Sequence, residues 1–165
     1  MQSAGVRINE ESLAWEPFSS PEGIFGASDR GLSLALTAQP RRPAARVSHP
    51  QRPFEIRLVL LPPGKRNCPL HMHSMQWEYY IVRSGRGQLR QEDGADPIPM
   101  EPGDHLSQPP SWVHCVENTG SEDLLYYVIA DNPVGETWRY PDSDKWGKGG
   151  RVFRMAETDF WEGEE

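Results

Sequence analysis

Residues 64–85 read GKRNCPLHMHSMQWEYYIVRSG, and this stretch decides the fold prediction. His71 and His73 stand two positions apart, shortly before a run of aromatic and branched residues that begins at Glu78. Alternate residues of a β-strand share one face, with Cα atoms roughly 6.6 Å apart. Two imidazoles at this spacing can therefore converge on one ion. The interval to Glu78 is long enough for a turn to bring its carboxylate to the same ion.

A third histidine, His114, follows Glu78 by 36 residues, after a proline-rich turn. Three neutral imidazoles and one carboxylate suit a divalent first-row metal such as Mn, Fe, Ni, Cu or Zn. Four protein ligands on one side of an ion would leave positions open for water or substrate, as catalytic metal sites do. A His-x-His pair alone is more often a surface accident or a hydrogen-bonded core pair than a metal site. The assignment of a metal site therefore depends on the spacing of the surrounding residues.

The wider spacing consists of two motifs separated by 17 residues. They read Gly64-x6-His71-x-His73-x4-Glu78-x6-Gly85 and Gly103-x5-Pro109-x-Ser111-x2-His114-x3-Asn118. Together they resemble the two motifs of the cupin superfamily, in particular small single-domain bacterial cupins. The resemblance implies an all-β fold, the cupin double-stranded β-helix or jelly-roll barrel. It also implies that one metal (Mn, Fe, Ni or Zn) is held inside the barrel by His71, His73, Glu78 and His114.

Two positions depart from the family pattern. The interval from Gly64 to His71 is one residue longer than usual, and Ser111 stands where the second motif normally has glycine. Both departures fall in turns, so they affect loop geometry more than the ligand set.

Proline and glycine divide the chain into short segments. The 16 prolines and 15 glycines favour many short strands over long helices. Residues 54–58 alternate apolar and charged side chains, and the run goes on to Leu61 before Pro62, which predicts a half-buried strand. Strands at 78–82 and 87–91, separated by the turn at 84–85, predict a hairpin. Residues 124–130 predict a buried strand.

We expect three regions along the chain. Residues 54–130 form the barrel. Residues 1–53 form an N-terminal arm or extra strands with a Pro/Arg-rich linker over 38–53. Residues 131–165 form a short, aromatic-rich C-terminal extension that packs on the barrel or on a dimer partner, because so many aromatic side chains rarely remain in water.

Strand alternation predicts which neighbours share the pocket with the ligands. The expected substrate-pocket residues are Tyr80, Val82, Trp112 and Val116. The phenol of Tyr80 is a candidate proton donor, although a core role is commoner for such a tyrosine. Cys115 has the opposite parity to His114 and should point away from the metal. Asn118 should fix the turn after its strand.

The composition excludes several function classes. The formal net charge of −7 argues against binding a nucleic-acid backbone. No stretch approaches the roughly 20 apolar residues of a membrane span, and residues 1–16 lack the apolar region of a secretory signal. Two cysteines are too few for a disulfide scaffold. We therefore expect a cytoplasmic protein with a small-molecule ligand, no nucleic-acid or membrane partner, and a homodimeric state.

Three functions remain open. The first is a metal-dependent enzyme on a small polar organic substrate, of dioxygenase, isomerase or lyase type. The second is a non-catalytic cupin that binds or senses a small molecule or sugar, because one fold serves many functions. The third is a structural β-barrel dimer, which would not require the full ligand set. The absence of a recognisable output domain favours the enzyme.

Overall fold

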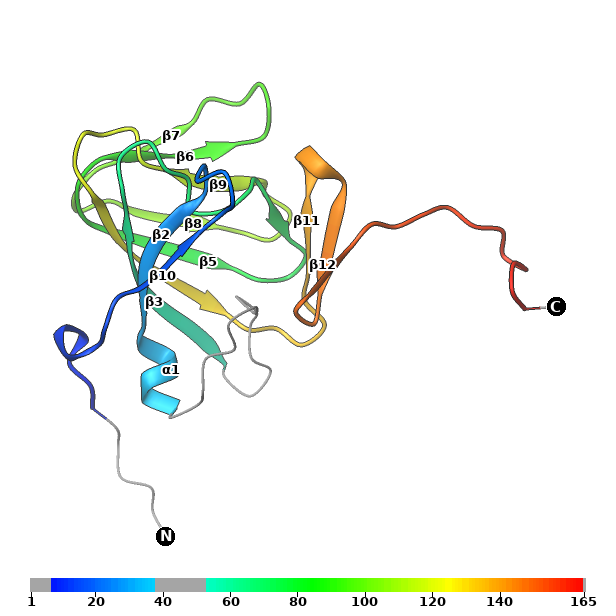
Figure 1. The fold of residues 1–165 in the computed structure, drawn as a ribbon, viewed down its shortest axis with the longest axis horizontal. Coiled ribbons are helices and arrows are strands. Elements are labelled where there is room, and N and C mark those ends of the chain that lie inside the picture. Colours follow the sequence, from blue (N-terminus) through cyan, green and yellow to red (C-terminus); the bar gives the residue numbers. More distant parts are fainter. Residues whose placement is uncertain (1–6, 38–52, 165) are drawn as a thin grey trace, which may run out of the picture.

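The computed structural model describes residues 7–37 and 53–164, and their regular structure is almost entirely β-strand (Figure 1). A short helix, α1 (Leu32–Thr37), and two single 3₁₀ turns, Glu10–Ser12 and Pro141–Ser143, complete these ranges. The strands are β1 (Glu16–Ser19), β2 (Gly26–Gly31), β3 (Phe54–Leu61), β4 (Met72–His73), β5 (Glu78–Ser84), β6 (Gly87–Gln91), β7 (Ile98–Met100), β8 (His105–Gln108), β9 (His114–Glu117), β10 (Leu124–Asp131), β11 (Thr137–Tyr140), β12 (Lys145–Lys148) and β13 (Arg151–Phe153).

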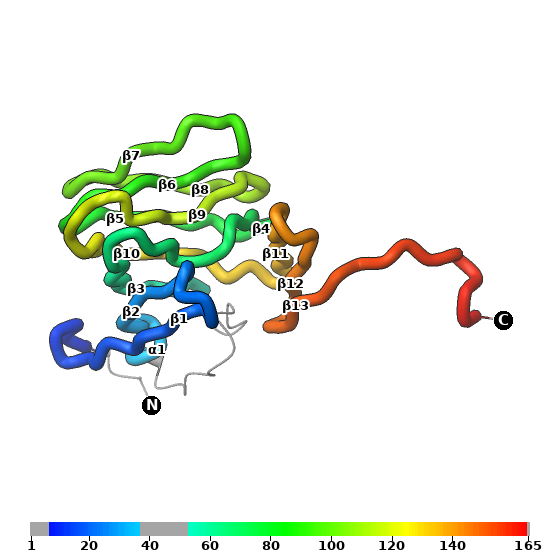
Figure 2. The backbone as a smooth tube through the Cα atoms, turned by 45° about the horizontal axis from the view of Figure 1, so that its top comes forward, coloured from blue at the N-terminus to red at the C-terminus, as the bar shows by residue number. Residues whose placement is uncertain are grey.

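The strands form three antiparallel sheets. A six-stranded sheet has the order β1-β2-β3-β10-β5-β8, and a three-stranded sheet has the order β7-β6-β9. The apolar core joins these two sheets, with Leu61, Tyr80 and Tyr126 from the larger one and Leu89 and Val116 from the smaller one. A four-stranded sheet, β13-β12-β11-β4, stands beside them (Figures 1 and 2). This is the all-β jelly-roll architecture that the sequence predicts.

Two predicted strands are confirmed. The first occupies residues 54–61 as β3, where Leu58 is buried on one face and Val59 and Leu61 on the other. The second, predicted over 124–130, runs to Asp131 as β10 and lies between β3 and β5. Leu124, Tyr126 and Ala130 are buried and the alternate residues Leu125, Tyr127 and Ile129 are half-buried, so both faces of the strand accommodate apolar side chains.

The predicted hairpin between residues 78–82 and 87–91 is wrong. Both strands exist, as β5 and β6, but β5 pairs with β10 and β8, whereas β6 pairs with β7 and β9. The turn between them carries the chain from one sheet to the other. Gly85 permits this crossing, because its φ is +77° and a Cβ there would lie 2.3 Å from the carbonyl oxygen of Asp123.

The regions outside the barrel differ from one another. The N-terminal strands β1 and β2 extend the six-stranded sheet beyond β3. Most of the predicted Pro/Arg-rich linker, residues 38–52, lies outside the described residues. Residues 131–153 build the sheet around β4, whereas residues 154–164 extend away from it (Figure 2). Phe160 and Trp161 are 81% and 63% exposed, so the packing of this segment on a dimer partner stays a prediction.

Within the described ranges, no helix has the length and apolar content needed to span a bilayer.

The crossing at Gly85 yields a stability prediction. Gly85→Ala should lower the free energy of unfolding by more than about 2 kcal/mol, because it adds a backbone clash to the strain of a positive φ. Gly64→Ala is the matched control: its φ is +70°, but nothing lies within 4 Å of the added Cβ. That control should cost about 1 kcal/mol. Urea unfolding of both variants measures the difference, and equal losses would contradict the steric argument.

Candidate metal centre

The two sequence motifs meet at one backbone pairing. The amide of His71 donates to the carbonyl of His114 at 3.1 Å, and the amide of His114 donates back to His71 at 2.8 Å. Reciprocal bonds of this kind define a hydrogen-bonded antiparallel pair, whose side chains lie next to each other. The centroids of the two imidazole rings are accordingly 4.6 Å apart. Residues 43 positions apart along the chain thus contribute adjacent ligands.

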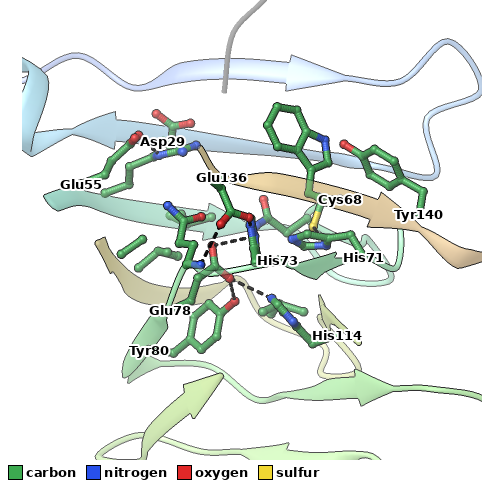
Figure 3. Close-up of a pocket in the computed structure, with 18 of the residues that line it drawn as sticks. Asp29, Glu55, Cys68, His71, His73, Glu78, Tyr80, His114, Glu136 and Tyr140 are labelled. Atoms are coloured by element: carbon green, nitrogen blue, oxygen red, sulfur yellow. Dashed lines mark hydrogen bonds and ion pairs between the residues drawn. The ribbon is translucent and has the colours of Figure 1, made fainter. Parts of the chain in front are cut away.

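The other two candidate ligands come from strand ends. His73 closes the two-residue strand β4, and Glu78 is the first residue of β5, so the turn over residues 74–77 brings them together. His114 Nε2 lies 2.8 Å from Glu78 Oε2, and His73 Nε2 lies 3.8 Å from Glu78 Oε1. Figure 3 shows the carboxylate of Glu78 between these two rings.

All three imidazoles use Nδ1 for a hydrogen bond outside the centre. Nδ1 of His71 lies 3.0 Å from the carbonyl of Pro69, and Nδ1 of His114 lies 3.0 Å from the carbonyl of Trp112. Nδ1 of His73 lies 3.2 Å from Glu136 Oε1. Each acceptor is an oxygen, so each Nδ1 carries a proton and a metal would bind through Nε2. At His114 the metal would displace the proton that Nε2 shares with Glu78 Oε2.

The donor set fits one divalent ion. The ligand atoms of His71, His73, Glu78 and His114 all lie within 4.8 Å of one another. Two ligands on opposite sides of an ion at about 2.1 Å each lie about 4 Å apart, so a small contraction completes the shell. Nε2 of His73 is buried and has no hydrogen-bond partner among the described residues. A buried nitrogen without a partner is costly, and a metal would satisfy it.

The electrostatics favour the metal-binding forms of Glu78 and His114. Burial alone would raise the pKa of Glu78, but the hydrogen bond from His114 and the charges of the three histidines hold it well below its usual range. Burial lowers the pKa of His114 and so favours its neutral ring. Burial lowers the pKa of His73, but the hydrogen bond with Glu136 and the charges of Glu78 and Glu136 raise it overall, so a metal would have to displace a proton there. Burial, together with the neighbouring Glu78 carboxylate, raises the pKa of Tyr80 well above its usual range. The phenol therefore stays protonated and donates to Glu78 Oε2.

Glu136 supports the centre, and the sequence gives no local sign of it. Its side chain is 4% exposed and accepts hydrogen bonds from the amides of Ser74, Met75 and Gln76 at 3.0, 2.8 and 2.9 Å, as well as from His73. One carboxylate thus holds both the turn that links His73 to Glu78 and the ring orientation of His73. Burial would raise the pKa of Glu136, but the bond with His73 and the amides lowers it.

The four candidate ligands line a cavity of about 270 Å³. Its wall also includes Asp29, Glu55, Arg57, Gln76, Trp138 and Tyr140, which the sequence did not predict there. Glu55 and Asp29 are 8% and 1% exposed. Arg57 Nε donates a hydrogen bond to Glu55 Oε1 at 2.5 Å, and the two side chains form an ion pair. In Figure 3 these two carboxylates lie at the end of the cavity opposite Tyr140.

The expected pocket residues divide into two groups. Tyr80 and Val116 line the cavity. Val82 is instead packed in the apolar core and is not among the described lining residues. Trp112 is 55% exposed and is also absent from that wall. Strand alternation fails at Trp112 because β9 begins only at His114, so Trp112 belongs to the preceding turn.

Three positions beside the ligands behave as their sequence context suggests. Asn118 donates to the carbonyls of Leu61 and Glu122 and accepts from the amide of Gly120, which fixes the turn after β9. The thiol of Cys115 points away from the centre and donates to the carbonyl of Cys68. Ser111 has a φ of +70°, the left-handed conformation that explains why the second motif normally has glycine here.

Comparison with known proteins identifies the family. Residues 57–130 match the sequence model of the cupin domain. The chain is a cupin-domain protein. This cupin domain superposes with a TM-score of 0.70 on the sugar phosphate isomerase of the cupin superfamily from Silicibacter pomeroyi, at 21% identity over 90% of this chain and 92% of the other. At that identity the likeness establishes the fold.

Two curated relatives match shorter segments. Glucose-6-phosphate isomerase of Thermococcus onnurineus is 36% identical over 62 residues, 36% of this chain and 33% of that protein. The oxalate-binding protein of Thermotoga maritima is 33% identical over 69 residues, 42% of this chain and 54% of that protein. The chain thus spans only a third to about half of the length of these relatives.

The ligand set yields a prediction on metal content. His71→Ala and His114→Ala should each remove most of the metal from protein purified without an affinity tag, with the β-sheet signal in circular dichroism retained. His105→Ala is the control, because His105 is exposed and lies outside the cluster. Elemental analysis provides the measurement. If both ligand variants keep one equivalent of metal, the ligand assignment is wrong.

The contacts of Glu136 yield a pH-dependent stability prediction. A carboxyl group whose pKa is lowered on folding stabilises the fold above its ordinary pKa near 4.5, and this stabilisation is lost as the pH falls through the lowered value. Glu136→Gln should therefore cost about 2 kcal/mol at neutral pH, and its cost should shrink towards pH 3. Denaturant titrations of both proteins across this range provide the measurement. A cost that does not change with pH would contradict the assigned role of the charge.

Proposed function

We propose that this cupin-domain protein is a metal-dependent enzyme that isomerises a small α-hydroxycarbonyl compound of the sugar type. The proposal rests on one observation: three imidazoles that can bind through Nε2 and one carboxylate lie together at the same cavity. A site with four protein ligands has room for substrate oxygens on the remaining side. The matches to glucose-6-phosphate isomerases and the shared fold with a sugar phosphate isomerase support this reaction class.

His71, His73, Glu78 and His114 would hold the ion, which as a Lewis acid would polarise the carbonyl and hydroxyl oxygens of such a substrate. The protein's own groups then handle the protons. Tyr80 keeps its hydroxyl proton because burial raises its pKa, so it can donate to a substrate oxygen near Glu78. Glu55 and Asp29 place carboxylate oxygens on the same cavity. These groups provide the proton acceptors that an isomerisation at carbon requires.

The cavity also favours small substrates. Its volume of about 270 Å³ lies just below the ~300–1,000 Å³ range of small-molecule pockets. A single monosaccharide-sized molecule suits that space, whereas a polymer does not. The buried side chains around it, including Glu136 and Gln76, limit access of water to the reacting atoms.

A non-catalytic binding protein is the second candidate. The match to an oxalate-binding protein supports it, since that relative shares 33% identity over 69 residues. In this case the ion would hold a small acid, and no proton transfer at carbon would follow.

The deciding experiment is proton exchange in D₂O. Metal-loaded protein is incubated with free aldoses and ketoses and with their phosphates, and NMR follows both the product and the deuterium at the carbon next to the carbonyl. We expect exchange and isomer formation with at least one sugar, a loss of at least about a hundredfold after metal removal, and recovery on adding the metal back.

Two results would contradict the isomerase. One is a complete absence of exchange with every sugar while the metal remains bound. The other is oxygen consumption with small acids in an oxygen-electrode assay run on the same preparation, which would indicate a dioxygenase. Tight oxalate binding without any turnover would favour the binding protein instead.

A further inference from the structure

A row of paired positions crosses the four-stranded sheet beside the metal centre. His73 of β4 pairs with Trp138 of β11, Trp138 pairs with Gly147 of β12, and Gly147 pairs with Val152 of β13. Directly paired residues of antiparallel strands have their side chains on the same face. His73, Trp138 and Val152 indeed all line the cavity. Trp138 therefore stands between a candidate metal ligand and a position that has no side chain.

The indole of Trp138 occupies the space that Gly147 leaves. A Cβ at Gly147 would lie 1.8, 2.1 and 2.3 Å from Cε2, Nε1 and Cζ2 of Trp138. Atoms of both fused rings thus occupy the space above β12 where a side chain of residue 147 would lie. Gly147 is not in the left-handed region, and its lack of a side chain is required by the indole rather than by the backbone.

Trp138 also lines the cavity, so an indole that covers β12 can present a ring face to a bound ligand. Tyr140, two residues further on the same face of β11, continues this wall, with its ring centroid 6.2 Å from that of His71. The far end of the cavity is polar, with the carboxylates of Asp29 and Glu55 (Figure 3). One wall of the cavity is therefore aromatic, and the opposite end offers hydrogen-bond acceptors.

We propose that Trp138 is the stacking platform for the C–H face of a monosaccharide ring, and that the missing side chain of Gly147 leaves the space that the indole occupies over β12. A sugar ring has an apolar C–H face and a rim of hydroxyl donors, which matches an aromatic wall opposed by carboxylates. The proposal rests on the proposed function, because it assigns the substrate class of the same cavity. It depends on residues beyond 57–130, so the extension rather than the matched cupin segment selects the ligand.

The test is direct binding to the metal-loaded full chain. Saturation-transfer NMR and calorimetry are carried out with free hexoses, with their 6-phosphates and with oxalate as a linear acid without a ring. The variants are Trp138→Ala, Trp138→Phe and Gly147→Ala. Trp161→Ala is the matched control, since Trp161 is 63% exposed in the C-terminal segment. Elemental analysis confirms that every variant retains its metal.

We expect saturation transfer to the ring C–H protons of hexoses or their phosphates. Trp138→Ala should weaken their binding about tenfold or more, and Trp138→Phe should restore most of it. Gly147→Ala should weaken binding comparably, although Gly147 itself presents no side chain, because the added Cβ displaces the indole. Trp161→Ala should have no effect. Oxalate, which has no C–H face, should bind Trp138→Ala and the unaltered protein equally.

Three results would contradict the stacking role of Trp138. They are unchanged sugar affinity in both Trp138→Ala and Gly147→Ala, failure of every sugar to bind the unaltered protein, and equal weakening of sugar and oxalate. The outcome is independent of turnover. Ring stacking without isomerisation would support the role of Trp138 and contradict the isomerase proposal. Isomerisation with an unchanged KM in Trp138→Ala would support the isomerase proposal and contradict the role of Trp138.

Discussion

The centre depends on the reciprocal pair of backbone hydrogen bonds between His71 and His114. This pairing joins the loop after β3 to the start of β9 and therefore fixes the distance between ligands from the two motifs. The remaining ligands follow from it, because His73 is two residues from His71 and Glu78 begins the strand that faces His114. A shift of one residue in this register would turn one imidazole out of the cavity. The barrel provides the rigidity that holds the pairing.

The second constraint is the orientation of the rings. Proximity alone does not make three histidines a ligand set, because each ring can present either nitrogen. Here the acceptors at Nδ1 are two backbone carbonyls and the carboxylate of Glu136, so all three rings present Nε2. Glu136 acts twice, since the same carboxylate accepts the amides of the turn between His73 and Glu78. Loss of this one side chain would therefore disturb both a ligand ring and a ligand-bearing turn.

The local spacing of the sequence predicted much of this arrangement. The His-x-His pair and the interval to Glu78 are short-range patterns, and the structure brings these residues together as the patterns suggest. The alternation in residues 54–58 also marks a strand, but its charged residues Glu55 and Arg57 line the cavity whereas Phe54 is 48% exposed. The missed features are long-range. Glu136 reaches residues 60–63 positions earlier, and no local pattern reports such a contact. The hairpin was wrong because a turn sequence does not show which partners its strands take, and Trp112 was misplaced because alternation was extended into a turn.

The central claim is that His71, His73, Glu78 and His114 bind one ion together. X-ray absorption at the edge of the metal that purifies with the protein tests it most directly. Coordination by these four residues predicts a shell of nitrogen and oxygen at about 2.0–2.2 Å with the outer-shell signal of three imidazoles. The thiol of Cys68 lies 3.5 Å from His71 Nδ1 and places a sulfur atom beside these ligands. A sulfur shell near 2.3 Å, or fewer than three imidazoles, would contradict this ligand set.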